Sequence, residues 1–233
     1  MSVSGANCII DLYHGDHVSD WHQVKQNGVA AVIHKATEGT SYRDGTYQLR
    51  KQAAKAAGLL WGAYHFASGQ DPIQQADHFL AYAQPGEDEL ICLDCEPSSH
   101  RPDQPKPADM TYAQMVAFVS RIRSETGRSP VIYGGDLLRS LMVGHAGSTV
   151  AQCPLWIAEY PSPQTSQPRH ALPEGWTSWT LWQYTDGIHG PQPHTVPGVA
   201  ACDRDTYNGT AAELQAKWPL TPPAVAPQIA MAS

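Results

Sequence analysis

Short apolar runs of strand character alternate with helical segments about five times along the first 143 residues of this chain. After residue 143 two further apolar runs follow, with no helical stretch between them. Strands that alternate with helices through short connections lie parallel and are joined by crossover helices. No GxGxxG or Walker sequence follows the first strand, which weighs against a nucleotide-binding doubly wound sheet. The pattern predicts an α/β fold and favours a closed barrel over an open sheet.

Hydrophobic periodicity and helix end signals locate the individual elements. Asp71 and Pro72 begin one helix as its N-cap and first residue. Thr111 and Gln114 form a capping box at the start of another, which Gly127 ends. We expect further helices at residues 18–27, 46–57 and 137–143, and strands at residues 7–14, 29–33, 59–66, 90–97, 130–134, 154–160 and 179–184.

The fourth apolar run, residues 90–97, ends in two acids one residue apart, Asp94 and Glu96. Alternate residues of a strand share a face, so both side chains point the same way, with Cβ atoms roughly 6–7 Å apart. Two carboxylates that close in a shielded place cannot both ionise freely, and one keeps its proton near neutral pH. A protonated carboxyl beside a carboxylate is the pair of groups that glycoside hydrolases use to cleave a glycosidic bond. The alternative is a strand that ends at the surface with two solvated acids.

Chemistry in parallel barrels takes place where the strands end, at the carboxyl-terminal face. Acids interleaved with aromatic residues there are typical of a sugar-binding cleft, because pyranose faces stack on rings while carboxylates bond hydroxyls. We expect Tyr42, Tyr64 and Tyr133 to contact sugar, whereas sugar contact and core packing are both open for Trp156 and Trp182. The residues at or near strand ends are Asp11, Lys35, Glu38, Tyr64, His65, Asp94, Glu96, Tyr133, Trp156, Tyr160, Trp182 and Tyr184.

Other reactive side chains are expected to be structural. Lys35 and Glu38 are read as an ion pair at the barrel rim, and His65 as a structural histidine. The five cysteines, an odd number, are read as buried thiols rather than a disulfide framework. No His–Cys cluster suggests zinc, so we expect no metal and no cofactor.

Composition excludes several partners and locations. A net charge of −7 argues against nucleic acid held through phosphate contacts. No run of eighteen apolar residues is present, so no membrane insertion is expected. The first residues lack the basic region and apolar core of an ordinary signal peptide. We therefore expect the protein to be made in the cytoplasm without a signal peptide, and to act as a monomer.

The strand-end residues also carry a family resemblance. The chain resembles the glycoside hydrolase family 25 lysozymes, the muramidases of the Chalaropsis type. The matching stretches run from about residue 7 to 210 in the family's order, and together they are far more specific than any one of them. They are Ile9-Ile10-Asp11, Lys35-Ala36-Thr37-Glu38-Gly39, Gly62-Ala63-Tyr64-His65-Phe66, Leu93-Asp94-Cys95-Glu96, Leu155-Trp156-Ile157-Ala158 with Tyr160, Leu181-Trp182-Gln183-Tyr184, and Cys202-Asp203-Arg204-Asp205-Thr206-Tyr207-Asn208-Gly209.

The resemblance implies an irregular TIM-like barrel of five β/α units followed by three further strands. It also implies hydrolysis of the β-1,4 bond between N-acetylmuramic acid and N-acetylglucosamine in peptidoglycan. In that reaction Glu96 is expected to be the general acid, and Asp94 to assist the substrate's acetamido group or to act more directly. Asp11 and Asp203 are expected to be supporting acids, and Asp205 is the alternative to Asp203 because it shares that residue's face.

Two other functions are open: a catalytically silent glycan-binding barrel, and a barrel hydrolase acting on another N-acetylated glycan such as chitin. The catalytic barrel is expected over residues 1–216, and residues 217–233, rich in Pro and Ala, are expected to be a disordered tail. The expected partner is a peptidoglycan glycan strand. The protein is expected to act either as a phage-type endolysin or as an effector delivered by contact-dependent secretion. An effector would also have a cognate immunity protein.

Overall fold

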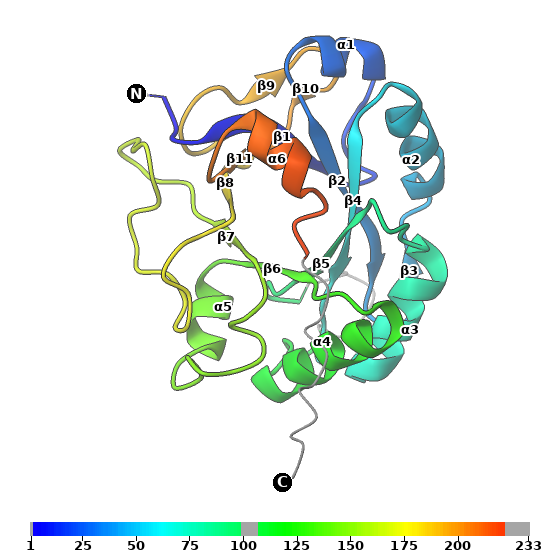
Figure 1. Cartoon of the computed structure of the whole chain (residues 1–233), viewed down its shortest axis with the longest axis vertical. Helices are drawn as coiled ribbons and strands as arrows, with labels where there is room; N and C mark the ends of the chain where they lie inside the picture. The colour runs from blue at the N-terminus through cyan, green and yellow to red at the C-terminus, as the bar shows by residue number, and fades with distance from the viewer. Residues whose placement is uncertain (1, 99–106, 222–233) are drawn as a thin grey trace, which may run out of the picture.

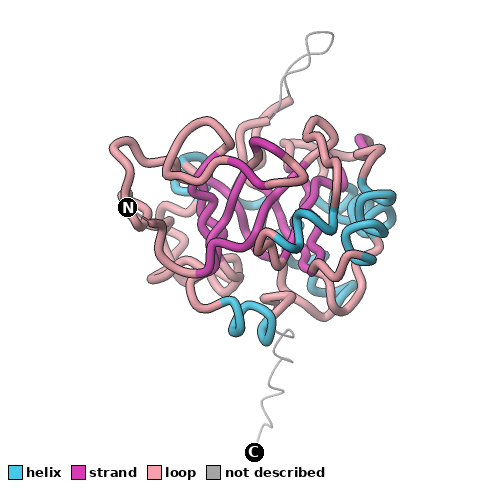
Figure 2. The backbone as a smooth tube through the Cα atoms, turned by 90° about the horizontal axis from the view of Figure 1, so that it is seen from above, coloured by secondary structure: helices cyan, strands magenta, loops and turns pink. Residues whose placement is uncertain are grey.

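The computed structural model describes residues 2–98 and 107–221, and eight of its strands close into a barrel (Figure 1). The two-residue strand β3 (Tyr42–Arg43) pairs with the outer part of β2. Figure 2 shows the strands at the centre, with helices and loops around them. The order round the barrel is β1 (Ala6–Leu12), β11 (Asp203–Tyr207), β8 (Leu181–Thr185), β7 (Leu155–Ala158), β6 (Val131–Gly134), β5 (Leu90–Asp94), β4 (Leu60–Phe66) and β2 (Ala31–Glu38), which pairs with β1 again.

Strand direction and helix placement agree with the predicted architecture. The strands β1, β2, β4, β5, β6, β7 and β8 run parallel, whereas β11 is antiparallel to both of its neighbours. A helix follows each of β1, β2, β4, β5 and β6, and residues 142–210, all of them described, contain no α-helix. The prediction of five β/α units followed by three strands is confirmed.

The predicted helix starts are confirmed at two caps. Asp71 accepts hydrogen bonds from the N–H groups of Ile73 and Gln74 and so begins α3 (Pro72–Ala83). Thr111 and Gln114 form the expected capping box of α4 (Tyr112–Thr126). The other crossover helices are α1 (Trp21–Gln26), α2 (Tyr47–Ala56) and α5 (Asp136–Leu141).

Alternate strand residues pack into two apolar layers, as the twofold period of a strand requires. One cluster fills the barrel interior and includes Ile9, Ile33 and Cys92. A second cluster lies between the strands and the helices and includes Trp61 and Phe118. The barrel is therefore a packed core, and space for a ligand remains at its ends.

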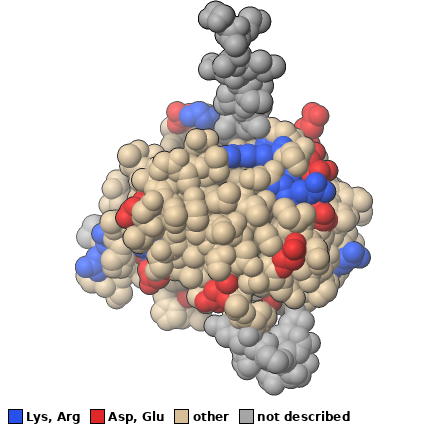
Figure 3. All heavy atoms as spheres, turned by 90° about the horizontal axis from the view of Figure 1, so that it is seen from below, with Lys and Arg blue, Asp and Glu red and all other residues tan. Residues whose placement is uncertain are grey.

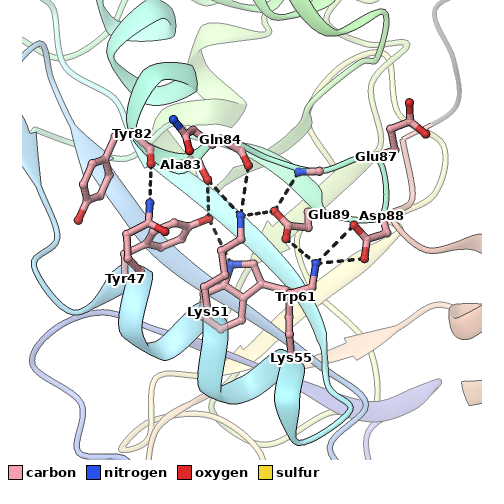
Figure 4. Close-up of polar contacts among 12 residues, drawn as sticks. Tyr47, Lys51, Lys55, Trp61, Tyr82, Ala83, Gln84, Glu87, Asp88 and Glu89 are labelled. Carbon is pink, nitrogen blue, oxygen red and sulfur yellow. Dashed lines mark hydrogen bonds and ion pairs between the residues drawn. The ribbon is translucent and has the colours of Figure 1, made fainter.

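An ion-pair network holds the amino-terminal end of β5, the strand that ends at Asp94 (Figure 4). The buried carboxylate of Glu89 accepts hydrogen bonds from Lys51 Nζ at 2.6 Å, from Lys55 Nζ at 2.7 Å and from the backbone N–H of Gly86 at 3.0 Å. Lys51 and Lys55 both lie on α2. The network therefore fastens the loop that enters β5 to the helix beside it.

The structure corrects three expectations about elements. The strand expected at residues 90–97 ends at Asp94, so Glu96 lies beyond it. The helix α6 (Ala211–Lys217) and the hairpin of β9 (Thr195–Val196) and β10 (Ala200–Ala201) were not predicted. Leu220 and Thr221 are buried, so the expected tail boundary at residue 217 is too early, because the packed part reaches residue 221. Residues 222–233 of the expected tail lie outside the described residues.

Opposite charges are interspersed on the face seen from below in Figure 3, where acidic and basic side chains lie scattered among a majority of uncharged residues. Among the surface ion pairs, Arg121 of α4 pairs with Asp77 of α3 and with Glu125 of its own helix. Among residues 2–98 and 107–221, no helix is long and apolar enough to cross a membrane.

Candidate active site

A cleft of about 180 Å³ opens where the parallel strands end. The antiparallel β11 contributes its first residue rather than its last, because an antiparallel strand starts where its parallel neighbours finish. All eight barrel strands, with the segments that follow β1 and β5, thus supply polar and aromatic side chains to one space. The residues that line it are Asp11, Tyr13, Lys35, Tyr64, Phe66, Asp94, Glu96, Tyr133, Trp156, Gln183 and Asp203.

The four acids predicted from the sequence all line this cleft. Asp94 is the last residue of β5 and is 5% exposed. Burial raises the pKa of Asp94 well above its usual range, the charge of Glu96 raises it further, and Lys35 opposes the rise. Burial likewise raises the pKa of Glu96, again against the charge of Lys35. The pair therefore has the shared-proton character that its spacing predicted.

The other two acids face each other across the junction of β1 and β11. Asp11 is the register partner of Asp203, and the side-chain amide of Gln183 donates to both, at 2.7 Å and 3.3 Å. Burial raises the pKa of Asp203 to about 7, with the charges of Asp16 and Asp186 as the next causes. Burial and the neighbouring Asp203 also raise the pKa of Asp11. The cleft is thus an acidic site in which burial and neighbouring charge raise the pKa of its carboxyls.

Gln183 is a central residue that the sequence reasoning did not single out. It lies within the stretch at residues 181–184 that resembles the family, in which its neighbour Trp182 is the candidate for sugar contact. Besides bonding the acids, Gln183 Oε1 accepts the hydroxyl of Tyr133 at 2.7 Å and that of Tyr160. Its position two residues from Leu181, an interior residue, could have indicated that it faces inward.

Three of the predicted sugar-contacting aromatics line the cleft: Tyr64, Tyr133 and Trp156. The rings of Tyr133 and Trp156 meet edge to face, with centroids 4.6 Å apart. Tyr13 and Phe66 were not singled out for this role, although each follows or ends a strand as the others do. Tyr13 is 45% exposed, which leaves its ring available to a ligand.

The structure places the remaining two predicted aromatics elsewhere. Trp182 is fully buried, and its indole N–H donates to the carbonyl of Glu159 at 2.8 Å. It alternates with Gln183 and so faces away from the barrel interior, where it packs in the core, which is one of the two roles left open for it. Tyr42 is outside the set of cleft-lining residues but lies beside it, since Lys35 Nζ is 5.5 Å from the centre of its ring.

The predicted structural roles of other reactive side chains are confirmed. Lys35 Nζ lies 2.6 Å from Glu38, and the same ammonium is 4.4 Å from the ring centre of Phe66. His65 is buried between Thr37 and Gln75. All five cysteines are free and buried. In the part of the chain that the structure describes, no group of three or more His, Cys, Asp or Glu is arranged to hold a metal ion.

A closed α/β barrel whose strand ends present paired carboxyls among aromatic rings defines a glycoside hydrolase. Residues 10–192 match the model of glycosyl hydrolases family 25, and the chain belongs to this family. It is 30% identical over 218 residues to Lysozyme M1 of Streptomyces globisporus, an alignment that covers 89% of this chain and 69% of the relative. It is 31% identical over 177 residues to the N,O-diacetylmuramidase of a Chalaropsis species, covering 68% and 78% of the two chains.

Solved structures agree with this assignment. The crystal structure of the bacterial lysozyme from Streptomyces coelicolor is similar with a TM-score of 0.74 and 31% identity, covering 91% of this chain and 96% of that one. A family 25 lysozyme from Aspergillus fumigatus gives a TM-score of 0.71 with 30% identity, covering 91% and 98%. The predicted family and barrel fold are confirmed, and the protein is a glycoside hydrolase of the lysozyme family.

Proposed function

We propose that the enzyme is an N-acetylmuramidase that hydrolyses the β-1,4 bond between N-acetylmuramic acid and N-acetylglucosamine in bacterial peptidoglycan. The observation that carries the proposal is the pairing of Asp94 and Glu96 at the end of β5, in a cleft where burial raises the pKa of both. The names of the two curated relatives, a lysozyme and a diacetylmuramidase, support the same substrate.

In this proposal Glu96 is the general acid. It follows the end of β5 and is less buried than Asp94, and both side chains line the cleft. A raised pKa keeps its carboxyl protonated at mildly acidic pH, which is the form that donates a proton to the glycosidic oxygen.

Asp94 is proposed to hold the substrate's acetamido group as its oxygen attacks the anomeric carbon. Its Oδ1 is buried and accepts no hydrogen bond from any described residue, although a buried carboxylate oxygen needs a donor. An acetamido N–H would supply that donor, and the ionised carboxylate would stabilise the positive charge that develops on the ring formed. Two successive inversions, first by the acetamido oxygen and then by water, keep the β configuration.

Asp11 and Asp203 are proposed to support this pair. They bond the same amide, that of Gln183, which in turn fixes the hydroxyl of Tyr133 in the cleft wall. Tyr64, Tyr133 and Trp156 are proposed to contact the sugar rings, and Tyr42 to contact a ring that extends past the cleft edge.

A digest of peptidoglycan against chitin oligomers, read by mass spectrometry, tests the proposal. Muropeptides with N-acetylmuramic acid at the reducing end are expected, with little product from chitin. Faster cleavage of chitin would establish the other hydrolase, and binding without cleavage of either glycan would establish a silent glycan-binding barrel.

We also propose that the enzyme acts as a monomer on the cell wall, in the periplasm or outside the cell. Phage-type lysis and contact-dependent secretion are the two routes that would bring it there. A neighbouring gene for a membrane pore supports the first, and a neighbouring gene whose product inhibits this enzyme, as an immunity protein does, supports the second.

A further inference from the structure

The loop that follows β1 places Tyr13 in the wall of the cleft. Tyr13 comes directly after Leu12, the last residue of β1, and lines the cleft with 45% of its surface exposed. The backbone N–H of Tyr13 donates to the carboxylate of Asp16 at 2.7 Å, and the N–H of Asp16 donates to the carbonyl of Tyr13 at 3.1 Å. Residues 13–16 therefore form one compact turn, and the position of this turn sets the position of the Tyr13 ring.

The side chain of Arg50, on helix α2, holds this turn. Its guanidinium donates from Nη1 to the carbonyl of Tyr13 at 2.7 Å and from Nη2 to the carbonyl of Asp16. One planar group therefore binds both ends of the turn, which fixes its orientation as well as its place. Arg50 is not among the residues that line the cleft, so we expect it to affect a ligand through the residues that it holds.

A buried histidine holds Arg50 in its turn. His34 of β2 is completely buried, and burial lowers its pKa to about 4, so its imidazole is neutral at neutral pH. Its Nδ1 lies 2.8 Å from the carbonyl of Lys35, which can only accept, so Nδ1 carries the hydrogen and Nε2 is an acceptor. Arg50 Nη1 lies 3.1 Å from that Nε2 and donates to it. The contacts from His34 through Arg50 to the turn thus match a donor with an acceptor at each step.

A second contact anchors the turn without replacing Arg50. The buried carboxylate of Asp44 accepts the backbone N–H of His14 at 2.8 Å. This bond fixes an N–H group in the middle of the turn, whereas Arg50 binds the carbonyls at its two ends. We therefore expect the turn to persist, but to lose its fixed orientation, when the Arg50 guanidinium is removed.

The Tyr13 ring lies against its own turn. A Cβ atom added to Gly15 would lie 2.4 Å from Cζ and 2.5 Å from the hydroxyl oxygen of Tyr13. Both distances are far shorter than a van der Waals contact, so the ring occupies the space that Gly15 leaves free. An aromatic ring that is confined in this way and still half exposed is suited to stack on a pyranose face, because it loses little freedom on binding.

From these contacts we propose that Tyr13 is a sugar-binding residue of the cleft and that Arg50 is a positioning residue, which holds Tyr13 against the bound glycan. The neutral imidazole of His34 holds Arg50 in place. The ligand is a pyranose ring of the glycan strand, stacked on the Tyr13 side chain. The proposal rests on the proposed muramidase function, since it assigns a further contact to the same cleft.

Substitutions of Tyr13 test the contact. Tyr13→Ala should raise KM for peptidoglycan by about three- to tenfold and change kcat by less than about twofold, because a stacking contact binds substrate and transition state alike. Tyr13→Phe keeps the ring and should stay within about twofold of the unmodified KM. An unchanged KM in Tyr13→Ala, or equal losses in the two variants, would overturn the stacking contact.

Gly15→Ala moves the ring and leaves Arg50 unaltered. The added methyl group displaces the far end of a flexible side chain, so the melting temperature should stay within about 2 °C while KM rises about threefold. Gly147→Ala is the matched control, because its methyl group meets no described atom within 4 Å apart from its chain neighbours, and it should change neither quantity. If Gly15→Ala leaves KM unchanged, the position of the Tyr13 ring does not matter and the proposal is wrong.

A double-mutant cycle shows whether Arg50 acts through Tyr13. Arg50→Met removes the donors but keeps an unbranched stem, and it should raise KM by about threefold or more. In the Tyr13→Ala background the same substitution should change KM by less than about twofold, because the ring that Arg50 positions is already absent. Effects that multiply in the double variant would refute the positioning role.

Arg50→Lys decides the positioning role if Arg50→Met does not fold. It keeps the charge but loses the planar fork that binds two carbonyls, so KM should still rise. An unchanged KM in this variant would show that the fork does not position Tyr13.

Failure of the proposed function is a separate outcome. If the unmodified protein cleaves no peptidoglycan, the muramidase assignment fails, and the same variants are compared by their dissociation constants for purified soluble glycan strands. Weaker binding by Tyr13→Ala and Gly15→Ala than by Gly147→Ala then supports the contact. Equal binding by all three variants, or no binding by the unmodified protein, overturns it.

Discussion

Removing the Glu89 carboxylate should weaken the fold while leaving the active-site groups in place. Glu89→Gln keeps the shape of the side chain but removes the charge that pairs with Lys51 and Lys55 (Figure 4). The carboxylate is 2% exposed, so its partners lose an interaction that is shielded from water. The network and the cleft lie at opposite ends of β5, since Glu89 directly precedes this strand and Asp94 is its last residue.

The magnitude follows from the two ion pairs. Breaking a buried pair by removing one partner costs about 3–5 kcal/mol. The low end of this range applies to the Glu89–Lys51 pair, because the Lys51 ammonium keeps the carbonyls of Ala83 and Gln84 as acceptors, both at 3.2 Å. Lys55 is 37% exposed and its pair contributes less than about 1 kcal/mol. We expect a loss of about 3 kcal/mol, or roughly 6–12 °C in the melting temperature of a chain this size.

Urea and thermal unfolding followed by circular dichroism measure the change, with Asp88→Asn as the matched control. That substitution removes the same charge from the adjacent residue and from the same Lys55 ammonium, but Asp88 is 73% exposed. It should change the free energy of unfolding by less than about 0.5 kcal/mol. If the two variants differ by less than about 1 kcal/mol, the ion-pair network does not stabilise the fold as argued.

Three further outcomes are expected. Glu96→Gln should lower turnover of peptidoglycan by a factor of about 10²–10⁴ and regain much of it on an aryl glycoside, whereas Asp94→Asn should slow both substrates alike; rescue of Asp94→Asn instead would exchange the two roles. Because the folded pKa of Asp203, about 7, lies above its unfolded value, the folded state binds the extra proton and its stability falls as pH rises from about 4 to 7. Asp203→Asn should therefore raise the melting temperature at pH 8 more than at pH 4, and equal shifts would contradict the raised pKa. Truncation after Thr221 should leave the melting temperature and lytic activity unchanged. Truncation after Trp218 should lower the melting temperature, because it removes the buried side chain of Leu220. Equal melting temperatures for the two truncated proteins would show that Leu220 does not stabilise the fold.

The elements and the acid pair were accessible from the sequence because they depend on local patterns. The apolar runs, the Asp71 cap and the capping box of α4 each follow from residues a few positions apart. The number of β/α units follows from the order of those runs. The pairing of Asp94 with Glu96 follows from their separation of two residues along the chain, and both acids line the cleft.

The sequence-based predictions failed where the structure of a segment depends on neighbours that are distant in sequence. Trp182 and Gln183 differ by one position, and the pleat sends one outward and the other into the cleft. Which of the two faces inward depends on the register of β8 with β7 and β11. The end of β5 before Glu96 and the packing of Leu220 similarly depend on neighbours distant in sequence.

The sequence by itself determined the fold class, the family and the four acids at the strand ends, since periodicity and motif spacing are properties of a single chain. Tertiary structure alone decided how those acids differ. Barrel closure brings β1 against β11, so Asp11 meets Asp203 and Asp205 across about 190 residues of sequence. Burial there raises the pKa of all three carboxyls, because desolvation and neighbouring charge depend on position in the barrel and cannot be read from residue order.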